Sequence, residues 1–267
     1  MKPSGIGGQA VIEGIMMRNK DMYSVAVRKP DGEIEVHLGT YQSIVKSKMI
    51  REIPLVRGVI NFIDSMILGM RTLTFSASFY EEEEEPTKAE VVLDKVTKGN
   101  SEKVLTGLTV AFSIVMAVAI FMILPYFLTN FLRDYVVSNT LLAIIEGVVR
   151  VGVFLIYILL ISRMNDIQRV FMYHGAEHKC INCIEHGMEL NVENVLKSSK
   201  HHKRCGTSFL FIVMFVSIIF FIFIRVTSPV LRVVIRLLLI PVIAGVSYEL
   251  IKFAGNSESK FVQIISY

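Results

Sequence analysis

Residues 104–132 read VLTGLTVAFSIVMAVAIFMILPYFLTNFL and contain no charged side chain. About 20 such residues in a helix cross a hydrocarbon core roughly 30 Å thick. The stretch therefore predicts a transmembrane helix, and Pro125 is tolerated near its end. Composition agrees with this reading, because 52% of the 267 residues are hydrophobic and 19% are charged. Such a chain is too apolar for an ordinary soluble domain.

Three more apolar stretches predict further spans, at about 141–163, 207–225 and 230–250. With the first span, at about 104–128, they predict a mainly α, polytopic α-helical membrane protein with about four transmembrane helices. The second span carries Glu146 and Arg150, one helical turn apart. At this spacing the two charges can pair inside a helix bundle, which lowers their cost in the membrane.

Basic residues predict the orientation, because short loops rich in Lys and Arg stay in the cytoplasm. The loop between the first two spans has Arg133 as its one basic residue, whereas the segment 164–205 is rich in them. We therefore expect this segment and both termini in the cytoplasm, although Arg225 and Arg232 go against the rule. Three cysteines fit a reducing compartment. The glycine-rich N-terminus lacks the apolar run of a signal peptide.

Residues 1–52 predict a small cytoplasmic module that contains a β-hairpin. Two alternating runs within 24–38 are joined by Pro30-Asp31-Gly32, which is a turn signal. The preceding stretch GGQAVIEGIMMR (7–18) predicts one further strand, plain or bulged at its glycines.

Between this module and the first span, residues 53–80 predict an amphipathic or re-entrant helix. Its charges, Arg57, Asp64 and Arg71, fall seven residues apart and line one stripe. Residues 81–103 begin with EEEEE and predict an acidic, charged linker. The transmembrane domain then occupies 104–267.

The sequence YHGAEHK (173–179) has two histidines four residues apart with a glutamate between them. In a helix, His174 and His178 project from one face, where neutral imidazoles can bind zinc. The pattern H-x-x-E-H is that of inverted zincins, in which the glutamate acts as a base. Glu177 is therefore the candidate catalytic residue.

The histidine and cysteine residues are concentrated around this motif. Five of the six histidines and all three cysteines lie within 174–205. A catalytic metal site would join His174 and His178 to one or two of Glu185, His202 and Cys205. A structural Cys₃His site would instead use Cys180, Cys183, His202 and Cys205. The same residues could also form a polar hairpin that binds no metal.

Three motifs, GGQAVIEGIMMR (7–18), YHGAEHK (173–179) and HKRCGTSF (202–209), resemble those of the YqhQ family of bacterial membrane proteins. The resemblance covers essentially the whole chain and implies a multi-pass protein of the bacterial cytoplasmic (inner) membrane. The family is uncharacterised and is labelled a predicted metal-dependent enzyme, a label that rests on the histidine motif. Family members typically extend beyond the equivalent of Tyr267, so the resemblance implies a shortened or incomplete chain.

The resemblance also narrows the candidate site. The family signature has no cysteine at position 180, which favours His174, His178, His202 and Cys205 as metal ligands. Further candidates at signature positions are Glu185, Glu13, Arg18 and Arg204. Lys203 stands where the family has proline, and we expect this difference to loosen the turn.

The leading hypothesis is a metal-dependent enzyme, of hydrolase type, with zinc as the first choice of divalent metal. Its substrate would be a protein or a lipid, and its surroundings the lipid bilayer. The alternative is a non-catalytic membrane scaffold or assembly factor whose His/Cys-rich loop is structural. Transport through the Glu146 and Arg150 pair is a third hypothesis. No basic patch interleaved with aromatic residues indicates nucleic acid, and nothing indicates an oligomeric state.

Overall fold

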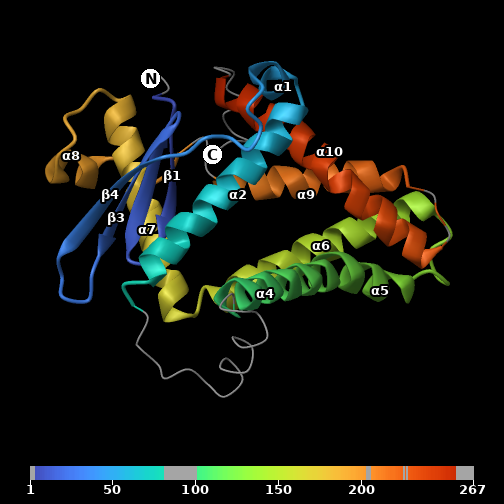
Figure 1. The fold of residues 1–267 in the computed structure, drawn as a ribbon. Helices are drawn as coiled ribbons and strands as arrows, with labels where there is room; N and C mark the ends of the chain where they lie inside the picture. Colours follow the sequence, from blue (N-terminus) through green and yellow to red (C-terminus); the bar gives the residue numbers. More distant parts are fainter. Residues whose placement is uncertain (1–3, 81–100, 203–205, 225, 227, 257–267) are drawn as a thin grey trace. The chain divides into compact units, whose positions relative to one another are not determined.

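The computed structural model describes residues 4–80, 101–202, 206–224, 226 and 228–256 (Figure 1). The chain is mainly helical, as predicted, and has a four-stranded sheet at its N-terminus, where the patterning predicts a hairpin and one further strand. It divides into two compact units. One unit comprises 1–80, 159–220 and 235–267, and the other comprises 81–158 and 221–234. The predicted acidic run at 81–85 lies outside the described residues.

The sheet is antiparallel and its strands follow the order of the sequence: β1 (Ile6–Val11), β2 (Gly14–Asn19), β3 (Met22–Arg28) and β4 (Ile34–Thr40). The predicted hairpin is confirmed, because β3 and β4 pair from Met22↔Thr40 to Arg28↔Ile34. The stretch 7–18 forms two strands instead of one. The chain reverses at Ile12 and Glu13, and Glu13 takes a φ of 50°, which few residues other than glycine adopt.

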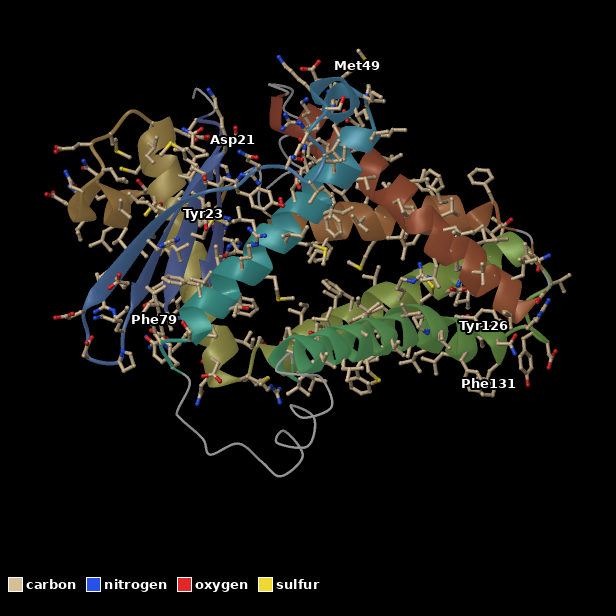
Figure 2. All side chains as sticks on the ribbon, in the orientation of Figure 1. Asp21, Tyr23, Met49, Phe79, Tyr126 and Phe131 are labelled. Atoms are coloured by element: carbon tan, nitrogen blue, oxygen red, sulfur yellow. The ribbon has the colours of Figure 1, made fainter. Side chains whose placement is uncertain are left out.

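The two faces of the sheet meet different helices (Figure 1). Helix α2 (Val56–Ala77) covers the face on which Leu68 packs against buried strand residues, including Val25 and Val27. Burying each of these side chains stabilises the fold by roughly 2 kcal/mol. Figure 2 shows Tyr23 on the sheet and Phe79 just beyond α2, and both pack against this core. Helix α7 (Asn165–Glu185) lies against β1 and β2 on the other face.

The predicted amphipathic helix is α2, and its one buried charge has specific partners. Asp64 Oδ1 accepts hydrogen bonds from the Tyr41 hydroxyl and the Ile44 backbone N–H, both at 3.1 Å. Short helix α1 (Lys48–Glu52) precedes α2. At its beginning, α2 packs on α10 (Pro229–Asn256), where Arg57 forms an ion pair with Glu249.

Among the described residues, three helical stretches are long and apolar enough to cross a membrane: Val104–Asn130, Asn139–Ile161 and Val230–Ala254. The first consists of α4 (Ser101–Val118), the π-helical η1 (Ala119–Ile123) and α5 (Leu124–Asn130). The second is α6 (Asn139–Ile161), and the third lies in α10.

The predicted span at 207–225 corresponds in the described chain to a shorter apolar helix. This helix is α9 (Gly206–Ile222), which has 17 residues. A helix of this length is about 25 Å long, at the lower end of the range for membrane-crossing helices, so this span stays a prediction. The predicted loop 164–205 is also largely helical, because it contains α7 and the short α8 (Val192–Lys197).

A proline and an arginine explain the π-helical turn inside the first span. Pro125 has no N–H, so the carbonyl of Phe121, four residues earlier, receives no helical hydrogen bond. Arg150 Nε donates to this carbonyl at 3.1 Å, and Arg150 Nη2 donates to Glu146 Oε1 at 3.0 Å. Both charged side chains are buried. The predicted Glu146–Arg150 pair is confirmed, and the backbone supplies a further partner.

We predict that Arg150→Leu lowers the free energy of unfolding by about 3 kcal/mol, because it leaves the Glu146 carboxylate buried beside an apolar side chain. Chemical unfolding of the detergent-solubilised protein measures this loss. The double variant Glu146→Gln/Arg150→Met removes both charges and should recover part of the stability. Equal losses in the single and double variants would contradict the pairing.

Candidate metal centre

Helix α7 brings the histidine motif onto one polar, buried face. The motif lies within the helix, the condition on which the expected shared face depends, and the spacing of three and four residues aligns His174, Glu177 and His178. Asp166 lies in the first turn, where a negative charge interacts favourably with the helix dipole and stabilises the helix. Glu177 and His178 are buried, 3% and 7% exposed, so the helix turns two ionisable side chains away from solvent.

The three side chains converge on one point. The ring centroids of His174 and His178 are 4.3 Å apart. Glu177 Oε2 lies 2.9 Å from His174 Nδ1 and 3.9 Å from His178 Nε2. One ligand atom from each of the three residues lies within 4.8 Å of the others. The arrangement can therefore hold one metal ion.

Glu177 Oε2 is the atom that tests whether a metal fits. It is buried, and its close contact with His174 lacks the geometry of a hydrogen bond. A buried carboxylate oxygen without a hydrogen bond is costly unless a cation compensates it. Two imidazoles and one carboxylate form a donor set that suits zinc and similar divalent metals. The residues present thus fit a divalent metal.

The tautomer of His178 is set by the chain segment that follows α8. His178 Nδ1 lies 2.8 Å from the backbone carbonyl of Lys200. A carbonyl can only accept, so Nδ1 must carry the proton. In a neutral ring the lone pair is then on Nε2, which lies 3.9 Å from Glu177 Oε2. A backbone carbonyl that orients a histidine in this way is typical of metal sites.

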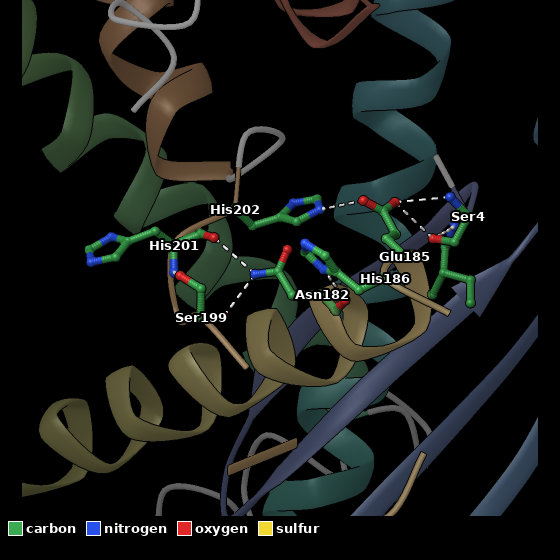
Figure 3. A network of polar contacts seen from close by, with 8 residues as sticks. Ser4, Asn182, Glu185, His186, Ser199, His201 and His202 are labelled. Carbon is green, nitrogen blue, oxygen red and sulfur yellow. Dashed lines mark hydrogen bonds and ion pairs between the residues drawn. The ribbon is translucent and has the colours of Figure 1, made fainter. Parts of the chain in front are cut away.

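A second polar network ties neighbouring segments to the same helix (Figure 3). His202 Nε2 lies 3.3 Å from Glu185 Oε2, and Glu185 Oε1 accepts from the Ser4 backbone N–H at 2.9 Å and the Ser4 hydroxyl at 3.0 Å. Asn182 Nδ2 donates to the carbonyls of Ser199 and His201, at 2.7 and 2.9 Å. These bonds fix the segment 199–202 on α7.

Strand β1 closes the site from the side of the sheet. A Cβ atom at Gly8 would lie 2.5 Å from Glu177 Cγ and 2.6 Å from Glu177 Oε1. Only glycine allows the strand backbone to lie this close to the carboxylate. Gly8 therefore helps to exclude water from Glu177.

The turn between β1 and β2 is attached to α7 through Glu13. Its carboxylate forms two short contacts with the Arg169 guanidinium and accepts from the Tyr173 hydroxyl at 3.2 Å. The hydrogen bond from Arg169 holds the pKa of Glu13 below its ordinary value, and partial burial opposes this effect. Glu13 thus fastens the glycine-rich hairpin to the helix that carries the motif.

The other predicted site residues lie outside the cluster of His174, Glu177 and His178 or outside the described residues. His202 and Glu185 pair with one another beside the cluster, and the rings of His202 and His178 lie 5.8 Å apart between centroids. Arg18 lies on the opposite face of the sheet, because it pairs across the strands with Gly7 and not with Gly8. Arg204 and Cys205 lie outside the described residues.

The cysteines of α7 do not join the histidine cluster. Cys183 is buried, and its thiol donates to the carbonyl of Glu189 at 3.4 Å. Cys180 is half-buried, and burial raises the pKa of its thiol. Within the described chain, the converging group is His174, Glu177 and His178.

Sequence reasoning did not identify Gly8, Arg169, Tyr173 or the Lys200 carbonyl as parts of the site. The paired glycines at 7 and 8 were the available signal, since a glycine in a strand often marks close approach of another group. The Lys200 carbonyl gives no signal in the sequence, because every residue has a backbone carbonyl.

We predict that Gly8→Ala destabilises the protein by about 2 kcal/mol, because a methyl group there overlaps the Glu177 side chain. Thermal unfolding followed by circular dichroism measures the effect. Gly7→Ala is the matched control, since a Cβ atom there has no neighbour within 4 Å among the described residues. Equal effects of the two variants would contradict the close contact with Glu177.

We predict that the stabilising contribution of Glu13 depends on pH. Its pKa is lowered from an ordinary value of 4.5 in the folded protein, so the contribution is full well above pH 4.5 and is lost as the pH falls through the lower folded value. Glu13→Gln should therefore be less stable than the wild type at pH 7, and the difference should shrink on acidification. Unfolding curves across this pH range measure it, and a difference that grows toward acid would disprove the assignment.

Comparisons with known proteins agree with the motifs. A family model described as a protein of unknown function (DUF1385) matches residues 53–267. The uncharacterized protein YqhQ of Bacillus subtilis (strain 168) is 34% identical over 256 residues, which cover 95% of this chain and 80% of that protein. No solved structure is significantly similar to the chain. The family match and the YqhQ relative together establish that this chain belongs to the YqhQ family.

Proposed function

We propose that this protein is a metal-dependent hydrolase of the membrane, with His174, Glu177 and His178 as its centre. The observation that carries the proposal is the position of Glu177 Oε2. This oxygen is buried, has no hydrogen bond to any described residue, and lies 2.9 Å and 3.9 Å from nitrogens of two imidazole rings. Such an arrangement is costly for a purely structural carboxylate and useful for one that binds or moves a proton beside a metal.

His174 and His178 would hold the ion, and zinc suits their nitrogen donors. A divalent metal bound there supplies a Lewis acid that polarises the scissile bond. Glu177 would accept the proton of the attacking water and pass it to the leaving group. Gly8 keeps bulk water from the carboxylate, and the Lys200 carbonyl keeps His178 in the tautomer that can bind metal.

The remaining metal ligands would come from the segment after α8. His202 is the nearest further histidine in the described chain, and its pairing with Glu185 gives it a fixed orientation. Cys205 follows three residues later in the sequence. If α7 and the segment after α8 both contribute ligands, metal binding would require the hydrogen bonds that hold 199–202 on α7.

The distribution of Lys and Arg supports a centre at the cytoplasmic face of the bacterial cytoplasmic membrane, with both termini inside. The three apolar helices suggest a lipid bilayer environment. A membrane-associated peptide bond or a lipid headgroup ester is the substrate class that such a location favours.

A non-catalytic scaffold is the second candidate, and the polar network around Asn182 favours it. Asn182, Glu185 and His178 bind backbone or side-chain groups of neighbouring segments without needing a metal. In that case the cluster would be a structural joint that presents a surface to a partner protein.

Metal analysis of protein purified without chelator tests the proposal. We expect about one transition-metal ion per chain in the wild type and loss of that ion in His174→Ala and His178→Ala. In this proposal the histidines hold the ion and Glu177 acts as the base. Glu177→Gln should therefore retain most of the metal and lose hydrolysis of fluorogenic peptide or phospholipid substrates. Cys205→Ala shows whether this thiol contributes a ligand.

The stability of the same variants separates the two candidates. An enzyme site tolerates His174→Ala with a nearly unchanged unfolding temperature, because this ring is partly exposed, at 28%. A structural joint should lose stability together with the metal. Absence of metal from the wild type, or full metal content in the double histidine variant, would remove the hydrolase proposal.

A further inference from the structure

A small pocket lies on the other side of β1 from the candidate metal centre. Its volume is about 120 Å³, and its walls include Gly7, Gln9, Met16 and Arg18 from the first hairpin and Ser65 and Leu68 from α2. Gly8 turns toward Glu177, so its neighbours Gly7 and Gln9 turn toward α2. Cavities of roughly 150 Å³ hold a benzene ring, so this pocket has room for a phosphate group.

Arg18 gives the pocket a positive charge in a fixed position. Its Nε donates to the carbonyl of Lys20 at 2.7 Å, and its guanidinium carbon lies 5.1 Å from the centroid of the Tyr41 ring. These two contacts orient the guanidinium. Its terminal nitrogens make no hydrogen bond to any residue in the described ranges, so two donor groups remain for a ligand.

Gln9 adds a second polar side chain whose donor groups remain for a ligand. Its amide lies against α2, where a Cβ atom at Gly69 would come 2.4 Å from Gln9 Oε1. Within the part of the chain that the structure describes, the amide has no hydrogen-bond partner. The nearby carboxylate of Asp64 is already engaged by Tyr41 and Ile44. A guanidinium and an amide without a lining carboxylate favour an oxyanion ligand.

The surface of α2 beside the pocket indicates where the oxyanion comes from. Phe62, Met66 and Leu73 are exposed, and they form a stripe that adjoins Ser65 and Gly69 on the helix. An exposed apolar stripe on a chain with three membrane-length helices suits contact with acyl chains. A basic pocket bordered by such a stripe matches a lipid that has a charged head and apolar tails.

We propose that the pocket formed by Gly7, Gln9, Arg18 and Ser65 binds the phosphate of an anionic phospholipid. Arg18 would donate to the phosphate oxygens, Gln9 would donate from its amide, and the acyl chains would follow the stripe on α2. This site is separate from the metal centre, and it stands whether or not the protein is a hydrolase. A soluble phosphate compound offers the same oxyanion and is the competing source.

Gly7 provides a variant that blocks the pocket without removing a charge. Gly7 pairs directly with Arg18 across the strands, and a Cβ atom at Gly7 meets no described atom within 4 Å. Gly7→Leu should therefore fill the space beside the guanidinium and leave the fold intact. Arg18→Gln removes the charge instead. Arg51→Gln, on the exposed helix α1, makes the same charge change away from the pocket.

The experiment is native mass spectrometry of the full chain in detergent with phosphatidylglycerol or phosphatidylcholine at equal concentration. We expect a phosphatidylglycerol adduct on the wild type and on Arg51→Gln, and an adduct about tenfold weaker on Gly7→Leu and Arg18→Gln. Circular dichroism checks that each variant folds. If Arg18→Gln fails to fold, Gly7→Leu still decides the question.

Two outcomes would overturn the proposal. Unchanged phosphatidylglycerol binding by Gly7→Leu would show that the lipid binds elsewhere. The second outcome combines two results: phosphatidylglycerol and phosphatidylcholine form equal adducts, and excess inorganic phosphate removes the adduct. Together these results would assign the pocket to a soluble phosphate compound and exclude the lipid.

Discussion

The contact between Gly8 and Glu177 is the constraint on which the candidate centre depends. It joins residues 169 positions apart in the sequence and leaves no room for a side chain on the strand. Because the backbone of β1 lies against the carboxylate, Glu177 is buried among polar groups without being surrounded by water. The attachment of Glu13 to Arg169 and Tyr173 keeps the same strand in position at its far end.

Much of the architecture follows from local sequence signals. Pro30-Asp31-Gly32 predicts the hairpin of β3 and β4, which is confirmed. The spacing of His174 and His178 predicts a shared face if the motif is helical, and the motif lies in α7. The face to which Arg18 points could not be predicted, because it depends on splitting 7–18 into two strands at Glu13, a residue with an unusual φ. A shift of one residue in a strand sends every side chain to the other face.

Other features of the structure could not be predicted from the sequence, for different physical reasons. The end of α9 at Ile222 could not be predicted, because an apolar sequence alone does not mark where a helix ends. Partners that are backbone carbonyls, such as Lys200 for His178 and Phe121 for Arg150, carry no residue-type signal. Tertiary geometry alone reveals them.

Strand β1 separates two polar surfaces by the thickness of one peptide chain. Gly7 borders the Arg18 pocket and Gly8 touches Glu177, although they are consecutive residues. Neither glycine has a side chain that could absorb a small sideways displacement of the strand. Any influence that a ligand on one surface exerts on binding at the other must then be reciprocal, since thermodynamic linkage makes the coupling free energy equal in both directions.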